Sequence, residues 1–256
     1  MNHTASSRSS SGRPTLSNTS SAPAIINHHP DANMLVEYAS GSLPWGLSIA
    51  VSAHLQLCQH CQQQHAKLSA LGGSCLNDAP KEAVNDDAFS RLLSNIDKAS
   101  TPAEDKVIEH CQQTAAQTLV NAKRAGINAE HLPRVVKKLL PPQLRWQKIS
   151  NALKSARLIT GQGKHEVAFH KISKGGKVVE HDHRGLEVTL VLEGSFSDEE
   201  GIYCPGDFLV REPGQVHRPT ASQNQDCLCL SVCEAPVKVT GLLGTLLNPF
   251  LSIQPA

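Results

Sequence analysis

The spacing of hydrophobic residues changes near the middle of the chain. Up to about residue 125, apolar side chains recur every three or four positions, as they do along one face of a helix. The clearest case lies in residues 86–98, where Phe89, Leu92, Leu93 and Ile96 form an amphipathic stripe. From about Trp146 apolar and polar residues alternate, which is typical of strands with one buried face. The pattern predicts a helical N-terminal part followed by an all-β C-terminal part.

Capping residues divide the N-terminal part into separate helices. Asp31 or Asn33 can cap a first short helix through Tyr38, and Gly41 can end it in the left-handed conformation. The adjacent glycines at 72 and 73 are expected to end the third helix. We therefore expect further helices over about residues 44–57, 59–71, 86–98 and 104–124.

The alternating pattern is most regular at Val188, Leu190 and Leu192. Short runs of this kind recur between turns rich in Gly and Pro. Such a series of short strands predicts a small antiparallel barrel or jelly roll. The fold class expected for the whole chain is thus α+β and multidomain.

The composition narrows the function classes. The chain has 256 residues, and 24 Lys and Arg nearly balance 23 Asp and Glu, giving a formal net charge of +1. This balance lacks the basic surface of a nucleic-acid-binding protein, so direct DNA contact is the least expected function. No apolar run approaches the roughly 20 residues of a membrane helix, and the N-terminus lacks the pattern of a secretory signal. Eight cysteines without an export signal favour the reducing cytoplasm and roles in metal binding or redox chemistry.

A first group of metal-ligand residues lies in the helical part. His54 and Cys58 are four residues apart and Cys61 follows three residues later, so the three share one side of a helical segment. A histidine from an earlier segment can complete a tetrahedral set of two imidazoles and two thiolates, which suits zinc. His28 and His29 are both available for this place.

A second group lies in the β part. His181 and His183 are two residues apart, and Glu187 follows at an even spacing, so an extended segment can present all three on one face. His217 can supply a fourth ligand from a later strand. Three imidazoles and a carboxylate suit zinc, iron, manganese or nickel.

These motifs resemble known protein families. His29, His54, Cys58 and Cys61, together with Tyr38 and Gly41, resemble the zinc-binding domain of the ChrR-type anti-sigma factors. The resemblance implies a four-helix domain stapled by zinc, with His29 as the fourth ligand. It also implies an extracytoplasmic-function sigma factor as the partner, held in part by the stripe Phe89, Leu92, Leu93 and Ile96.

The second group resembles the two motifs of the cupins, jelly-roll barrels that hold a metal. Gly175, His181, His183, Glu187 and Gly194 match the first motif without gaps. The second motif, around His217, departs from the pattern because Pro213 and Gly214 are adjacent. In the ChrR type such a cupin follows the zinc domain, which implies release of the sigma factor on an oxidative signal, singlet oxygen or organic peroxide, sensed through the cupin.

The resemblance and the composition together divide the chain into parts. We expect a disordered tail over residues 1–25, a zinc-binding anti-sigma domain over 26–98, a helical connector over 99–142, a cupin domain over 143–240 and a C-terminal tail over 241–256.

Alternatives stay open at several positions. Cys227 and Cys229 alternate on a strand and are either small core residues or a redox pair. The helical stripe either contacts the sigma factor or closes the core of its own domain. The cupin is also compatible with a metalloenzyme of the dioxygenase or isomerase type, in which His165 and His170 could act as acid–base groups. The attached helical module favours the regulator, for which we expect no catalytic residue.

Overall fold

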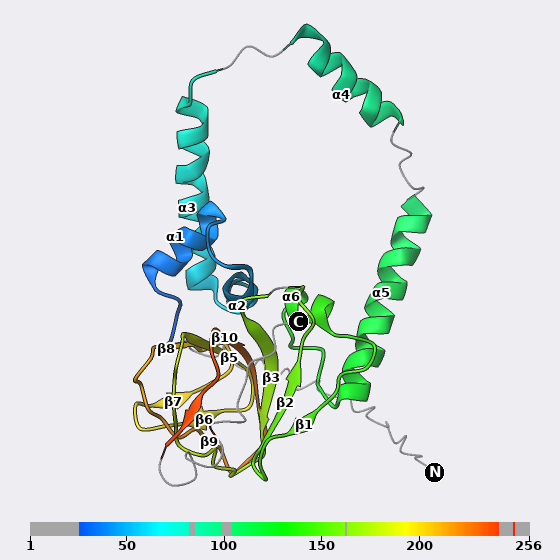
Figure 1. The fold of residues 1–256 in the computed structure, drawn as a ribbon. Helices are drawn as coiled ribbons and strands as arrows, with labels where there is room; N and C mark the ends of the chain where they lie inside the picture. The colour runs from blue at the N-terminus through cyan, green and yellow to red at the C-terminus, as the bar shows by residue number, and fades with distance from the viewer. Residues whose placement is uncertain (1–25, 82–84, 99–103, 162, 241–247, 249–256) are drawn as a thin grey trace, which may run out of the picture.

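The computed structural model describes residues 26–81, 85–98, 104–161, 163–240 and residue 248. Figure 1 shows a group of helices standing on a β-barrel, so the expected order of an all-α part and an all-β jelly roll is confirmed. The two expected tails, residues 1–25 and 241–256, lie outside the described residues except for Asn248.

The helices lie in the first half of the chain, where the apolar residues recur every three or four positions. They are α1 (Ala32–Ser40), α2 (Trp45–Leu55), α3 (Gln59–Asp78), α4 (Asp86–Lys98), α5 (Glu104–Ala125) and α6 (Arg134–Leu139). Of the two candidate caps of α1, Asp31 is the one used, because its carboxylate accepts the backbone N–H of Met34 at 2.7 Å. Gly41 ends α1 with a φ of 75°, as expected.

Helix α3 is longer than the sequence pattern predicts. The expectation that Gly72 and Gly73 end it was wrong, since both lie inside the helix. Each glycine costs about 1 kcal/mol relative to alanine in a helix, a penalty that the residues on either side outweigh. The helix ends at Asp78, because the following Ala79 precedes a proline and adopts an extended conformation with a ψ of 145°.

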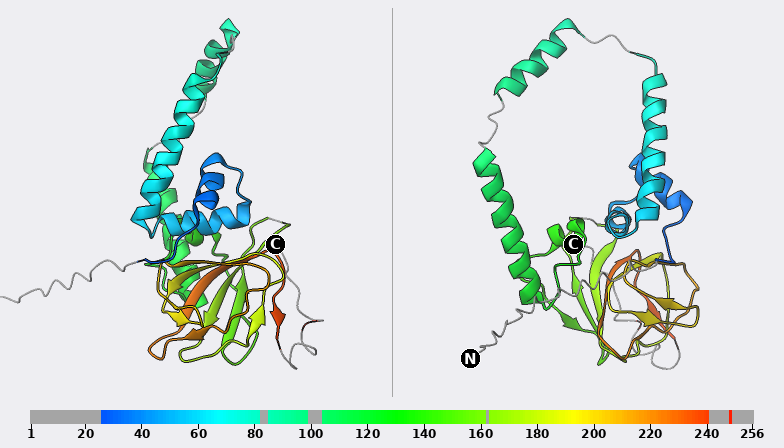
Figure 2. Two further views of the ribbon diagram at one scale, coloured as in Figure 1. Left: turned by 90° about the vertical axis from the view of Figure 1, so that its left-hand side faces the viewer. Right: turned by 180° about the vertical axis from the view of Figure 1, so that it is seen from behind.

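Helices α3, α4 and α5 form an arch above the barrel. Helix α3 rises from the body of the protein, α4 spans the top and α5 returns to the barrel, as seen from the front in Figure 1 and from behind in the right view of Figure 2. Helix α4 therefore lies apart from α1, α2 and the lower part of α3. The first four helices do not close into a bundle around their own core.

The short helix α6 was not expected from the sequence. Lys137 and Lys138 lie in its last turn, and its Val136 is fully buried. Ile127 and Leu132 in the loop before it are buried as well. The second half of the expected connector is thus packed into the body of the protein.

The barrel consists of short antiparallel strands. They are β1 (Gln147–Lys148), β2 (Leu153–Arg157), β3 (Glu166–Ile172), β4 (His181–Asp182), β5 (Glu187–Glu193), β6 (Phe196–Ser197), β7 (Ile202–Tyr203), β8 (Phe208–Arg211), β9 (Thr220–Ala221), β10 (Cys227–Cys233) and β11 (Lys238–Val239). The main sheet has the order β1-β2-β3-β10-β5-β8. Two small sheets, β7-β6-β9 and β11-β4, complete the barrel.

The helices and the barrel share one hydrophobic core. Ile49 and Val51 of α2 belong to the same buried cluster as Val188 and Leu230 of the main sheet. The approach of α2 to the barrel requires a glycine at position 46, since a Cβ there would lie 2.8 Å from the Cβ of His165. Because of this contact, the first group of metal-ligand residues is held directly against the barrel.

Candidate metal centres

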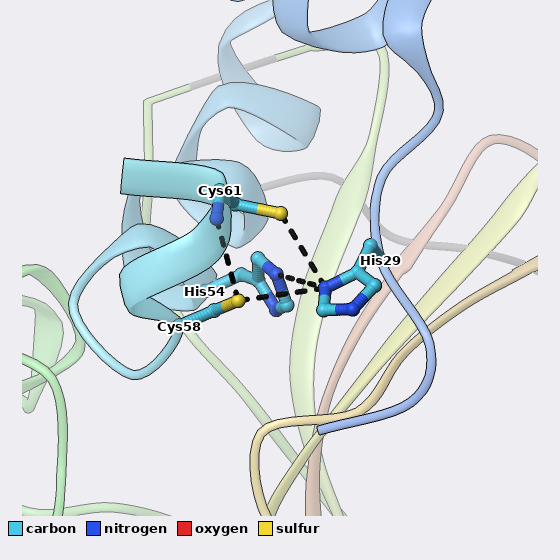
Figure 3. A group of neighbouring side chains, drawn as sticks. All are labelled: His29, His54, Cys58 and Cys61. Carbon is cyan, nitrogen blue, oxygen red and sulfur yellow. Dashed lines mark hydrogen bonds between the residues drawn. The ribbon is translucent and has the colours of Figure 1, made fainter. Parts of the chain in front are cut away.

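The first group is assembled by three neighbouring segments. His29 comes from the strap before α1, defined here as residues 26–29, and His54 lies in the last turn of α2. Cys58 is the N-cap of α3, and Cys61 lies in the first turn of that helix. Figure 3 shows the four side chains pointing toward a common centre. The structure thus brings together the four residues that the sequence singled out, and their ligand atoms lie within 4.8 Å of one another.

The spacing of these atoms fits a tetrahedral metal site. His29 Nδ1 lies 3.4 Å from both Cys58 Sγ and Cys61 Sγ, and 3.5 Å from His54 Nε2. A single ring nitrogen cannot form hydrogen bonds to all three atoms at once. Zinc bonds of about 2.0–2.3 Å give tetrahedral edges of about 3.3–3.8 Å, which match these separations. The donor set and its geometry therefore fit zinc.

A backbone carbonyl of the barrel orients His54. Its Nδ1 donates to the carbonyl oxygen of Gly206 at 2.9 Å, which leaves the Nε2 lone pair facing the other three ligands. The side chain is completely buried, and this burial lowers the pKa of His54 to about 4. The imidazole is therefore neutral at pH 7, as a metal ligand must be.

Asp207, next to Gly206, holds the strap that carries His29. Its Oδ1 accepts the backbone N–H groups of Asn27 at 2.8 Å and His28 at 3.0 Å. The N–H of Phe208 donates to the carbonyl of His28 at 3.0 Å. The His28 ring packs edge-on against Tyr203, with ring centroids 4.8 Å apart, and so points away from the thiolates. Of the two candidate histidines, the structure brings His29 to the cluster.

The second group lies inside the barrel. His181 is in β4, His183 follows it, Glu187 begins β5 and His217 precedes β9. The three imidazoles lie within 4.8 Å of one another and are buried. His181 and His217 also pair through their backbones, which fixes their positions across the barrel.

Each imidazole of this group is held through its Nδ1 atom. His181 Nδ1 lies 2.9 Å from the carbonyl of Val179, and His183 Nδ1 lies 2.6 Å from the carbonyl of Gln215. Because both acceptors are carbonyl oxygens, both Nδ1 atoms must carry the proton, and both Nε2 atoms present lone pairs. His217 Nδ1 faces the carboxylate of Asp198 in the same way, at 3.0 Å.

These lone pairs need a cation. His181 Nε2 and His217 Nε2 lie only 3.1 Å apart, and two lone pairs at that distance repel each other. Glu187 adds a carboxylate, with Oε2 at 3.3 Å from His183 Nε2. Both of these atoms are buried without a hydrogen-bond partner, whereas Glu187 Oε1 accepts from Ser231 Oγ at 3.0 Å. Converging nitrogens and a free carboxylate oxygen fit a divalent metal ion.

Glu187 is ionised in this environment. Burial opposes the charged form, but in the metal-free protein a proton on His183 and the neighbouring imidazoles outweigh it and lower the pKa of Glu187 to about 2. A metal ion would take the place of that proton. The site therefore offers one negative charge and three imidazoles, a donor set that does not distinguish among zinc, iron, manganese and nickel.

The comparison with protein families agrees with this geometry. Residues 139–237 match the family model described as the ChrR cupin-like domain. This part of the chain is therefore similar to the cupin-like domain of ChrR. Most of the chain is similar to the anti-sigma-E factor ChrR of Cereibacter sphaeroides, with 29% identity over 228 residues that cover 89% of this chain and 99% of that protein.

Solved structures extend the similarity to the helices. A chain in the crystal structure of Rhodobacter sphaeroides SigE in complex with the anti-sigma ChrR has 29% identity and a TM-score of 0.62, and the match covers 82% of this chain and 99% of that one. An RmlC-like cupin protein from Ralstonia eutropha matches with 15% identity and a TM-score of 0.37 over 41% of this chain and 73% of its own. The resemblance to the ChrR type that was drawn from the metal-ligand motifs is confirmed.

Asp198, which holds a ligand of the cupin site, was not predicted from the sequence. Its side chain is fully buried, and its Oδ2 lies 3.0 Å from His217 Nδ1 and 2.9 Å from Arg211 Nη2. Tyr203 OH donates to Oδ1 at 3.0 Å. Burial raises the pKa of Asp198, but the hydrogen bonds from His217 and Arg211 outweigh it and lower the pKa to about 2. No motif marks this residue, because it lies 19 positions from His217 and meets it only in the fold.

The remaining candidates take different places. Cys227 and Cys229 are buried on β10, with 3.7 Å between their Sγ atoms. The contact with Cys227 and burial raise the pKa of Cys229, so its thiol is protonated at neutral pH. A redox role for this pair stays a prediction. His165 is buried beneath α2, where it packs against Gly46, and His170 lies on β3 near the cupin site.

Burial of the ligand histidines predicts a pH-dependent stability. Burial lowers the pKa of both His54 and His217 to about 4, against about 6.5 in the unfolded chain. Between these values the unfolded state binds more protons, so the metal-free protein should lose about 1.4 kcal/mol of unfolding free energy per group for each pH unit below 6.5. Denaturant unfolding in chelator at pH 7.5, 6 and 5 measures this loss.

A variant provides the control for this prediction. His217→Gln removes one of the two titrating groups and should show a clearly shallower pH dependence than the parent. An unfolding free energy of the parent protein that is constant from pH 7.5 to 5 would contradict the assignment of neutral, buried imidazoles.

Proposed function

We propose that this protein is an anti-sigma factor that binds and inhibits an extracytoplasmic-function sigma factor. The similarity to the anti-sigma-E factor ChrR carries the proposal, because it runs over 89% of this chain and 99% of that protein. A ChrR-containing complex with SigE is also the structural match with a TM-score of 0.62. This similarity favours a regulatory role over the metalloenzyme alternative.

The arch of α3, α4 and α5 supplies a surface for the sigma factor. Large apolar side chains are exposed along all three helices: Leu71, Leu76, Phe89, Leu92, Leu93, Ile96, Leu119 and Val120. Exposed apolar side chains in such number are uncommon on a monomer and typical of a binding surface. The stripe of α4 does not close a core with the other helices, so it is available to a partner (Figure 1).

A single charge in the stripe should therefore weaken the proposed complex. Leu92 is 55% exposed, so Leu92→Asp should leave the fold and the zinc content unchanged. Placing a carboxylate in an apolar contact should raise the Kd for the sigma factor about 30- to 700-fold, since a central interface residue contributes about 2–4 kcal/mol. Surface-bound sigma factor titrated with purified protein measures the change.

The matched control is Ile202→Asp, which places the same charge at a side chain that is 70% exposed on β7, away from the arch. It should bind like the parent. Equal affinity of the Leu92→Asp protein and the parent would remove α4 from the interface.

We further propose that the cupin senses an oxidative signal, singlet oxygen or organic peroxide, and lowers the affinity for the sigma factor. A short chain of contacts supports a link between the two metal centres. His217 contacts Asp198, Asp198 accepts from Tyr203 OH, and the Tyr203 ring packs against His28 beside the zinc ligand His29. A change at the cupin metal that moves His217 would thus act on the strap. For this to be allosteric, the signal must favour one of two states of the strap.

The metals follow from the donor sets in this proposal. Zinc is held by His29, His54, Cys58 and Cys61 and gives the strap and α3 a fixed geometry. The cupin metal, zinc or else iron, manganese or nickel, supplies the reactive centre for the signal. A partner that serves RNA polymerase implies a cytoplasmic protein. Within the described residues, no helix is both long and apolar enough to cross a membrane.

A further inference from the structure

A cavity of about 270 Å³ opens beside the cupin metal ligands. His181, Glu187 and His217 line its inner end, and all three are buried. Ile149 and Val179 line it as well, and both are exposed, so they mark its mouth. The cavity thus leads from the surface of the barrel to the metal site.

The wall between these ends is apolar. It is formed mainly by aliphatic and aromatic side chains, among them Leu153, Ile172, Val178, Phe196 and Val239. Among the described residues that line the cavity there is no lysine and no arginine. The polar side chains of the lining are Ser150, next to Ile149 at the mouth, and Thr189, His170 and the metal ligands farther in. A charged group of a ligand can therefore be compensated only by the metal at the inner end.

The charge at the inner end of the cavity determines which charge the polar group of a ligand must carry. A divalent metal ion held by Glu187 and neutral imidazoles keeps a net positive charge, because Glu187 is the carboxylate among the ligands. If the metal were absent, no lysine or arginine of the described lining would compensate the charge of a bound anion. An anionic oxygen beside the metal neutralises this charge.

The volume limits the length of the ligand. A water molecule occupies about 30 Å³ in the liquid, so 270 Å³ holds on the order of nine non-hydrogen atoms. A straight chain of about eight carbons with one terminal carboxylate is of this size.

We propose that the cupin cavity binds a medium-chain monocarboxylate, with the carboxylate at the metal and the hydrocarbon chain along the apolar wall toward Ile149 and Val179. The proposal identifies the class of ligand that binds in the proposed sensor domain, and it therefore rests on the proposed function. A bound monocarboxylate would shield the metal ligands from water and control the access of other small molecules to the metal.

Calorimetric titration of the full-length, metal-loaded protein with octanoate tests the proposal. We expect saturable binding of one octanoate per chain and a negative heat-capacity change from the buried hydrocarbon. Octan-1-ol, which lacks the charge, should bind at least about tenfold more weakly. Equal binding of octanol and octanoate, or no binding of octanoate, would overturn the proposal.

Two variants locate the ligand. Ile149→Asp places a charge at the mouth of the cavity and should weaken octanoate binding about tenfold. Ile159→Asp places the same charge at a side chain that is 72% exposed and does not line the cavity, and it should bind octanoate like the parent. Equal weakening by both variants would overturn the assignment.

The chain's own C-terminal segment is the competing occupant. Asn248 is bound to the backbone of Val239 at the cavity, at 2.7 and 3.0 Å, and the sequence around it is rich in leucine. If a protein ending at residue 240 bound octanoate and the full chain did not, the segment would be the occupant and the proposal would be wrong. Affinity for the sigma factor is measured separately, so a failed octanoate experiment leaves the proposed anti-sigma function standing.

Discussion

Replacing Cys61 with alanine should remove one metal ion per chain and abolish binding of the sigma factor. Cys61 is buried in the first turn of α3 and lies 3.4 Å from His29 Nδ1. Without its thiolate the site keeps three ligands, which is too few for a structural zinc site. We expect the unfolding free energy to fall by more than about 4 kcal/mol, the range found when a structural metal is lost.

The loss should be confined to the helical end of the molecule. Desolvation by burial and the neighbouring Cys58 raise the pKa of Cys61 to about 12, so its proton leaves only when a metal replaces it. The strap and α3 would lose their fixed geometry, whereas the barrel strands keep their own hydrogen-bonded pairs. Metal analysis, hydrogen exchange and sigma-factor binding together measure these effects.

Cys75→Ala is the matched control for this variant. Cys75 lies on the same helix but is exposed and outside the cluster. It should keep the zinc content, stability and sigma binding of the parent. A Cys61→Ala protein that retained its full metal content and bound the sigma factor normally would contradict the role of the cluster.

Short-range patterns predicted both metal centres. His54, Cys58 and Cys61 lie within eight residues, and their separations follow from the helix and its cap, so the sequence alone places them together. The same holds for His181 and His183, which face one way because they alternate on an extended segment. The spacing did not fix the two distant ligands: His28 and His29 stayed open until the family resemblance favoured His29, and His217 was named only as a ligand from a later strand.

Contacts between distant segments could not be predicted in this way. The carbonyl of Gly206 that orients His54 comes from 152 residues away, and the sequence carries no sign of it. Gly72 and Gly73 gave the wrong end for α3, because local propensity does not decide where a long helix stops. The shared core of α2 and the barrel explains why the two expected domains meet so closely, a feature that separate patterns in each half do not contain.

Asp198→Asn should weaken metal binding in the cupin about 10- to 100-fold, the usual effect of removing a carboxylate that holds a ligand histidine. The neutral amide no longer anchors the protonated Nδ1 of His217 with a charge-assisted hydrogen bond. It also leaves Arg211, which is buried, with Glu200 as its remaining ion-pair partner. We expect a loss of about 3 kcal/mol in unfolding free energy, the low end for a broken buried ion pair.

Glu200→Gln separates the two effects of this substitution. Glu200 pairs with the same arginine at 3.1 Å, but its side chain is 58% exposed, and it does not contact His217. The control should lose at most about 1 kcal/mol and keep its cupin metal. Metal titration monitored by calorimetry, followed by denaturant unfolding, distinguishes the two variants, and equal metal affinity in both would show that Asp198 does not position His217.

The Asp198→Asn protein also tests the link between the two centres. Its zinc cluster is untouched, so it should bind the sigma factor like the parent in the absence of oxidant. With His217 loosened and the hydrogen bond from Tyr203 OH weakened, a change at the cupin metal no longer reaches the strap through this chain of contacts. Oxidant should then release less sigma factor than from the parent. Full release from a variant with normal metal occupancy would mean that the signal travels by another route, and the proposed path from His217 to His28 would be wrong.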